Sequence, residues 1–150
     1  MKRLVISTLL ALAISTPALG QTSAEKSFSQ GMESFRSGSF EVALTAFEKA
    51  RKEGMTHPSL YYNMGVSAYR LARHEEARDY FLIAANYDNL RQVAHYNLGL
   101  VALKLGDRAD AIAWFDRALE GDNDKIRALA ATQLNQLTSC LLYTSPSPRD

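Results

Sequence analysis

Small and aromatic residues recur every 34 positions along this chain. Each unit has glycine at position 8, alanine at positions 20 and 27 and phenylalanine at position 24, as in Gly31, Ala43, Ala50 and Phe47. No insertion or deletion separates the three units, which span residues 24–57, 58–91 and 92–125. A period of this length is typical of stacked helix pairs. The pattern therefore predicts six helices, over residues 24–37, 41–54, 58–71, 75–88, 92–105 and 109–122.

The recurrent glycines indicate where the two helices of a unit pack most closely. A glycine inside a helix costs about 0.5–1 kcal/mol relative to alanine, so the three at position 8 need a compensating contact. We expect close backbone approach where the paired helices cross, with the three phenylalanines filling the space between units. Gly38 and Gly106, at position 15, are expected to end the first helix of their units, and Ala72 is a weaker stop at the same position.

These positions resemble the tetratricopeptide repeat, whose consensus has small residues at 8, 20 and 27, an aromatic residue near 11 or 12, glycine at 15 and an aromatic residue at 24. The resemblance covers residues 24–125. It implies an all-α fold, a right-handed superhelical α-solenoid of three helix pairs. Residues 126–138 predict one more amphipathic helix, which either caps the third pair or opens an atypical fourth unit.

The two ends of the chain differ from the array. Residues 1–20 combine a basic start, an apolar run and the small-residue motif Ala18-Leu19-Gly20, which predicts a removable secretory signal. The apolar run is short of the ~20 residues that span a bilayer, so we expect no membrane insertion of this segment. Residues 140–150 resemble one reading frame of a sequencing-library adapter, which would make them an artefact; a genuine disordered Ser/Pro tail is the alternative. The repeat domain is then residues 21–139.

Charge and motifs exclude several classes of function. Setting aside Lys2, Arg3 and Arg149 leaves 14 of the 17 basic residues, and setting aside Asp150 leaves 15 of the 16 acidic ones, a net charge of −1. A near-neutral domain gives no support to nucleic-acid binding. The three histidines have no metal-ligand spacing, and no phosphate-binding loop or activated nucleophile is recognisable. We therefore expect no catalytic residue, no metal and no cofactor.

The family resemblance also implies a binding surface on the first helix of each unit. In tetratricopeptide arrays positions 2, 5, 6, 9, 12 and 13 of that helix chiefly line a concave groove. The implied lining is Phe28, Met32, Phe35 and Arg36 in the first unit, Tyr62, Asn63, Val66, Tyr69 and Arg70 in the second, and Tyr96, Asn97, Leu100, Leu103 and Lys104 in the third. The asparagines would hydrogen-bond a ligand's backbone.

The groove predicts an extended or helical peptide with apolar anchors and acidic character. A second interpretation is structural, since cations at position 13 keep a helix surface soluble and aromatic residues at position 12 are partly core. Phe28, Val93 and Asn97 occupy positions where the chaperone-tail clamp of some family members has lysine or arginine. A clamp for the terminal carboxylate of cytosolic chaperones is therefore not expected.

The favoured hypothesis is a non-enzymatic, exported protein of the Gram-negative periplasm that binds a peptide or protein partner. The main alternative is the N-terminal periplasmic scaffold of a longer protein, either an outer-membrane β-barrel exporter or a cell-wall enzyme. A self-associating structural array is the third hypothesis.

Overall fold

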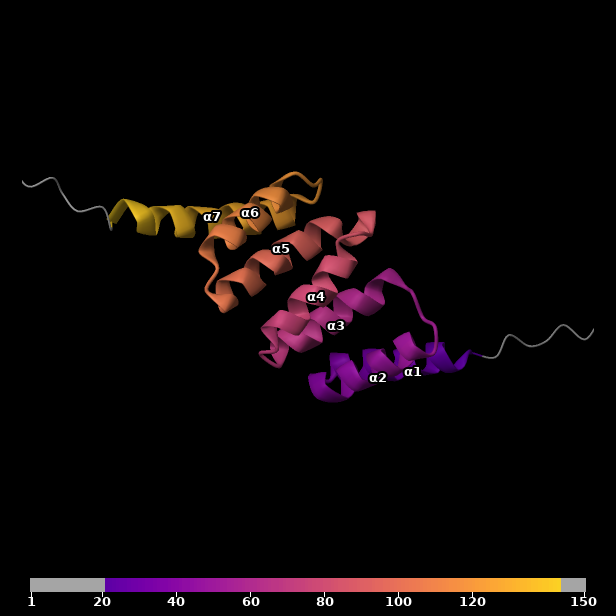
Figure 1. The fold of residues 1–150 in the computed structure, drawn as a ribbon. Helices are drawn as coiled ribbons and strands as arrows, with labels where there is room; N and C mark the ends of the chain where they lie inside the picture. Colours follow the sequence, from indigo (N-terminus) through magenta and orange to yellow (C-terminus); the bar gives the residue numbers. More distant parts are fainter. Residues whose placement is uncertain (1–20, 144–150) are drawn as a thin grey trace, which may run out of the picture.

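The computed structural model describes residues 21–143, and side chains as far as residue 139. The described residues form helices and turns only, in the order α1 Ser23–Arg36, α2 Phe40–Lys52, α3 Pro58–Arg70, α4 His74–Ala84, α5 Asp88–Leu105, α6 Arg108–Leu119 and α7 Asp124–Tyr143 (Figure 1). The predicted signal segment 1–20 and residues 144–150 of the tail lie outside them. Within the described helices, none is both long and apolar enough to cross a membrane.

Consecutive helices pack as antiparallel neighbours to give an α-solenoid, with strong contact inside each of the pairs α1/α2, α3/α4 and α5/α6 (Figure 1). The predicted helix order is confirmed; among the six paired helices two boundaries differ by four residues and the others by at most three. Helix α4 ends at Ala84, its last buried residue, and α5 begins already at Asp88. The third unit's first helix is therefore one turn longer than expected, with an aspartate in the first turn where a negative charge stabilises the helix.

Helix α7 is also longer than residues 126–138. It begins at Asp124 and ends at Tyr143, so it takes in the first residues of the segment 140–150 that the sequence analysis set apart. One stripe packs on α6, with Ala130 fully buried and Ile126, Leu134 and Leu137 partly buried around it. Its remaining surface up to residue 139 is mostly exposed and polar. This helix covers the end of the third pair.

Each position-8 glycine lies directly under the phenylalanine ring of its own unit. A Cβ atom added to Gly65 would lie 2.7 Å from Cε1 of Phe81, and the other two units repeat this arrangement. The three phenylalanine rings are at most 1 % exposed. The energetic cost of each helical glycine is thus not offset by the close approach of two backbones that the sequence analysis predicted. It is offset by packing of the phenylalanine ring of the same unit on that glycine. The ring replaces the missing side chain within the pair, with burial worth about 1.5–3 kcal/mol for each ring.

The first helix of every unit is followed, within two residues, by a residue in the left-handed conformation. Gly38 has φ 78°, Gly106 has φ 82°, and Ala72 adopts φ 59° at the same position of the second unit. The amide of the next residue caps the helix in each case, for example Arg73 N to Ala68 O at 2.9 Å. The tight turn therefore forms without glycine in the second unit, although Ala72 adopts a left-handed backbone conformation that is unfavourable for alanine.

The solenoid has an inner and an outer layer of helices. Helix α3 contacts both α1 and α5, whereas the backbones of α2, α4 and α6 do not come near one another. A curved stack brings its inner elements together and spreads its outer ones. The first helices of the units, α1, α3 and α5, consequently form the inner layer.

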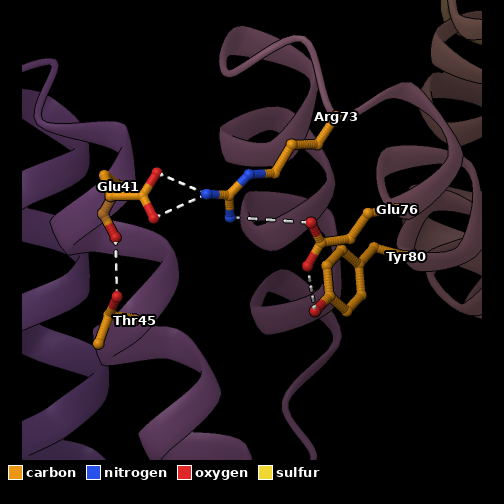
Figure 2. A network of polar contacts seen from close by, with 5 residues as sticks. All are labelled: Glu41, Thr45, Arg73, Glu76 and Tyr80. Atoms are coloured by element: carbon orange, nitrogen blue, oxygen red, sulfur yellow. Dashed lines mark hydrogen bonds and ion pairs between the residues drawn. The ribbon is translucent and has the colours of Figure 1, made fainter.

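A polar network ties the outer parts of the first two units together (Figure 2). Nη2 of Arg73 donates to both carboxylate oxygens of Glu41, at 2.8 and 2.9 Å, and Nη1 lies 3.9 Å from Glu76. Thr45 donates to the carbonyl of Glu41, and Tyr80 donates to Glu76 at 3.2 Å. The Glu41 carboxylate raises the pKa of Arg73. Partial burial, with Glu76 beside it, raises the pKa of Tyr80 to about 12.

Candidate functional site

Aromatic side chains at position 5 of each unit line the inner layer while resting on the core. Each of these rings packs against the buried phenylalanine of its own unit, and each stays partly exposed. The pairs are Phe28 with Phe47, Tyr62 with Phe81 and Tyr96 with Phe115, with ring centroids 5.6, 5.9 and 5.6 Å apart. Core packing therefore fixes the orientation of these rings, and their outer edges remain available.

The aromatic side chain at position 12 packs against the ring at position 17, across the turn of the same unit. Phe35 meets Phe40 edge to face at 5.6 Å, and Tyr69 lies 5.5 Å from His74. The third unit has Leu103 in this place. Together with positions 5 and 9, these residues form an apolar band of half-buried side chains, comprising Phe28, Met32, Phe35, Tyr62, Val66, Tyr69, Tyr96, Leu100 and Leu103.

The two asparagines do not behave as the sequence analysis expected. Asn63 is buried, with 8 % exposure, and its Nδ2 donates to the sulfur of Met32 at 3.1 Å. Asn97 is half-buried, and its Nδ2 donates to the carbonyl of Val93 at 2.9 Å and, more weakly, to the Tyr62 hydroxyl at 3.4 Å. The prediction that Asn63 lines the groove is corrected here, because its side chain is buried and bonded to Met32 of the preceding unit. The amide nitrogens of both residues therefore donate to groups inside the protein.

Three cations border the apolar band on one side. Arg36 and Arg70 are the last residues of α1 and α3, and Lys104 is the last but one of α5. All three are exposed, and among the described side chains none of them has a carboxylate within 4.0 Å. The guanidinium of Arg70 lies 5.1 Å over the ring of Phe40 in the preceding unit. We call this row the basic edge.

A cation in the last turn of a helix also stabilises that helix, by about 0.3–1 kcal/mol. Position alone therefore does not mark these residues as ligand-binding. Their placement in a row beside the apolar band does indicate ligand binding, because it puts positive charges and apolar side chains on one face. The face carries a band for apolar anchors and an adjacent edge for negative charge.

The larger cavity lies away from this face. It has a volume of about 720 Å³ and is formed where the start of α5, the end of α6 and the start of α7 meet, with His95 and Arg117 in its wall. A smaller one of about 240 Å³ lies between α4, α5 and α6 beside Trp114. Neither is lined by a residue of the apolar band or the basic edge. Neither of these two cavities therefore coincides with the predicted site.

Sequence reasoning missed Gln92, which organises the wall of the larger cavity. Its Nε2 donates to the carbonyls of Ala118 and Asn123 at 2.9 and 3.3 Å, and its Oε1 accepts from Asn123 N at 2.9 Å. The side chain so fixes the turn that leads into α7. Position 1 differs in every unit, so the repeat pattern contained no signal for this role. Burial lowers the pKa of the neighbouring His95.

Comparison with known proteins agrees with the repeat architecture. Models of the family described as tetratricopeptide repeat match residues 28–91 and residues 92–120, which together cover most of the described helices. The chain belongs to the tetratricopeptide repeat family. No curated protein sequence matches it.

Solved structures of other tetratricopeptide repeat domains have the same fold. The type III secretion chaperone SycD of Yersinia enterocolitica, in complex with a peptide of the translocator YopD, has a TM-score of 0.70 at 15% identity, over 81% of this chain and 97% of that one. The first repeat domain of Spaghetti (RPAP3), bound to the HSP90 peptide SRMEEVD, has a TM-score of 0.66 at 20% identity, over 79% and 93%. The Sgt2 domain from Aspergillus fumigatus scores 0.69 at 17% identity, over 89% and 91%.

Proposed function

We propose that this chain is a non-enzymatic protein-interaction module that binds a peptide or protein partner along the inner face of α1, α3 and α5. The observation that carries the proposal is the basic edge, three exposed cations without a carboxylate partner among the described side chains, beside a continuous apolar band. Such a surface suits a ligand with apolar anchors and negative charge. The structural neighbours determined with bound peptides support the same class of function.

The proposal includes the place where the module acts. The basic, apolar and small-residue pattern of residues 1–20 supports export, and we place the mature domain in the periplasm of a Gram-negative cell. Expression in such a host followed by fractionation tests this part. We expect the domain in the periplasmic fraction with Gln21 as its first residue by mass spectrometry. An uncleaved chain in the cytoplasm would contradict the proposed export and would not affect the proposed binding.

The binding part is tested with the double variant Tyr62→Ala with Tyr69→Ala, immobilised and exposed to a periplasmic extract. Both rings belong to the apolar band, and we expect the captured partner to fall at least tenfold. The matched control is Leu82→Ala with Ile83→Ala, two exposed apolar residues of the outer helix α4. Capture by this control should equal that of the unmodified protein.

Tyr62 rests on Phe81, so the double variant also loses some core packing. A second variant avoids that ambiguity, because Arg36→Gln with Lys104→Gln changes only exposed side chains. Circular dichroism and thermal melting establish that each protein is folded. Unchanged capture by both folded groove variants would show that the partner binds elsewhere. Light scattering over a range of concentrations separates partner binding from self-association, for which we expect a monomer.

A further inference from the structure

A carboxylate of the first unit is held in a polar cluster between the two helices of its pair. The two carboxylate oxygens of Glu53 accept hydrogen bonds from the hydroxyls of Ser23 and Ser27 on α1, both at 2.7 Å, and Nζ of Lys49 lies 4.0 Å away. The two hydrogen bonds lower the pKa of Glu53. Glu53 is at position 30 of its unit, and its partners are at positions 0, 4 and 26, where position 0 is the residue directly before the unit.

The third unit has more basic residues at the three partner positions and lacks the carboxylate. Positions 0, 4 and 26 are Arg91, His95 and Arg117, and position 30 is Gly121. All four line the cavity of about 720 Å³. A longer residue has no room at position 30, because a Cβ atom on Gly121 would overlap the side chain of Gln92. The cavity is thus lined by the positions that surround a carboxylate in the first unit.

The side chain of Gln92 does not replace this carboxylate. Its Nε2 donates to the carbonyls of Ala118 and Asn123, and its Oε1 accepts from Asn123 N, so both ends of the amide are bonded to backbone groups around the turn before α7. The second unit has no comparable cluster, since it has tyrosine at position 30 and no lysine or arginine at the other three positions. The basic positions without their own carboxylate therefore occur in the third unit alone.

Arg117 is the cation of this cavity that is best placed to receive a carboxylate. Arg91 is paired with Asp88 in the first turn of α5. Arg117 has no carboxylate within 4.0 Å among the described side chains, and its guanidinium lies 4.6 Å over the ring of Trp114. Stacking on an aromatic ring orients a guanidinium while its N–H groups stay available for hydrogen bonds.

Acidic and apolar groups complete the lining. Glu120 and Asp122 line the same cavity, and neither has a basic nitrogen within 4.0 Å among the described side chains. A ligand with a carboxylate alone would be repelled by these two groups, whereas a ligand that also carries an ammonium group complements both signs of charge. Val93 and Ile126 add apolar surface to the wall.

From these observations we infer that the cavity between α5, α6 and α7 binds a small zwitterion with an apolar side chain, of the amino-acid or short-peptide class. The carboxylate of the ligand pairs with Arg117 in the place that Glu53 has in the first unit, and its ammonium group faces Glu120 and Asp122. A volume of about 720 Å³ lies within the range of about 300–1,000 Å³ that is usual for small-molecule sites. The inference goes beyond partner binding on the inner face and does not depend on it.

Three compounds with related carbon skeletons test the charge requirement by calorimetry and by the fluorescence of Trp114, the single tryptophan of the chain. L-leucine carries both charges, 4-methylpentanoate lacks the ammonium group, and 3-methylbutylamine lacks the carboxylate. We expect L-leucine to bind with a Kd of about 1 mM or less, and the other two to bind at least tenfold more weakly. Glycyl-leucine distinguishes the two sources of such a ligand, because tighter binding than L-leucine indicates a peptide and weaker binding a free amino acid.

Variants locate the bound charges. Arg117→Gln should weaken L-leucine at least tenfold, and Arg117→Lys, which keeps the charge, should weaken it less. The matched control is Lys49→Gln at the same position of the first unit, where Glu53 already supplies the carboxylate, and it should change nothing. Glu120→Gln should weaken L-leucine and strengthen 4-methylpentanoate, because it removes a negative charge. Calorimetry is used for the Arg117 variants, since they alter the surroundings of Trp114, and circular dichroism checks that each variant is folded.

Three results would overturn the inference. They are no saturable signal from L-leucine or glycyl-leucine up to about 10 mM, binding of 4-methylpentanoate as tight as that of L-leucine, and unchanged binding by folded Arg117→Gln. Tyr62→Ala with Tyr69→Ala should leave L-leucine binding unchanged, because both tyrosines lie outside the lining of this cavity. Failure of partner capture on the inner face and failure of this site are therefore separate outcomes.

Discussion

The left-handed alanine that ends α3 offers the sharpest test of how this repeat turns its chain. Ala72 has φ 59°, whereas the same position in the other two units is occupied by Gly38 and Gly106 at φ 78° and 82°. A left-handed conformation costs an L-residue about 1–2 kcal/mol, and glycine avoids this cost. Glycine also loses more entropy on folding, which takes back about 0.4–1 kcal/mol. Ala72→Gly should therefore stabilise the protein by about 0.5–1 kcal/mol.

Urea unfolding monitored by circular dichroism measures this change, with an unchanged m-value as the sign that only stability moved. The expected gain corresponds to a rise in Tm of about 2–5 °C for a domain of this size. Gly38→Ala and Gly106→Ala are reciprocal controls. A Cβ atom at either glycine meets nothing within 4 Å, so their loss of about 0.5–1 kcal/mol would be purely conformational. A neutral or destabilising Ala72→Gly would refute the reasoning, because no lost packing could explain it.

Two further predictions concern the core and the outer network. Gly65→Ala should cost about 1–2 kcal/mol because the new methyl group overlaps the ring of Phe81, and most of that cost should vanish when Phe81→Leu is also present; a double-mutant cycle by urea unfolding with strictly additive effects would contradict this. Burial raises the pKa of Tyr80 to about 12, so the folded state holds this proton more tightly than the unfolded state does, and stability should fall as pH rises from 10 through 12. Tyr80→Phe should remove that part of the pH dependence, and parallel curves for both proteins would show that Tyr80 is not its source.

The repeat made most of the fold predictable from the sequence. A contact that recurs in every unit leaves the same residue type at the same position, as Gly31 and Phe47 show together with their counterparts. The period therefore revealed which helices pair and which faces they bury. The nature of the contact was less accessible, because a small residue indicates closeness without indicating what comes close. Only the structure shows a phenyl ring on each glycine.

Contacts that occur in only one unit could not be predicted from the repeat. The contact of Asn63 with Met32, 31 residues earlier, joins the first two units, and the other units lack this pair. Gln92 fixes the turn into α7 through groups 26 and 31 residues away. The ion pair of Glu41 with Arg73 likewise joins the first two units alone. Each depends on the side chains that two neighbouring units place opposite one another, which a period cannot specify.

For the candidate site too, the repeated features could be predicted from the sequence and the contacts of single residues could not. The sequence by itself determined the family resemblance, the helix order and the row of Arg36, Arg70 and Lys104, since all three follow from a repeat of 34 residues. The tertiary structure decided what the groove can offer a ligand. Asn63 is buried and bonded to the preceding unit, and the amide nitrogen of Asn97 is bonded within its own helix. Aromatic edges stay exposed, as do three cations that have no carboxylate partner among the described side chains. A hydrogen-bonding group recognises a ligand only if its own protein has not already satisfied it, and that depends on neighbours that the fold brings together.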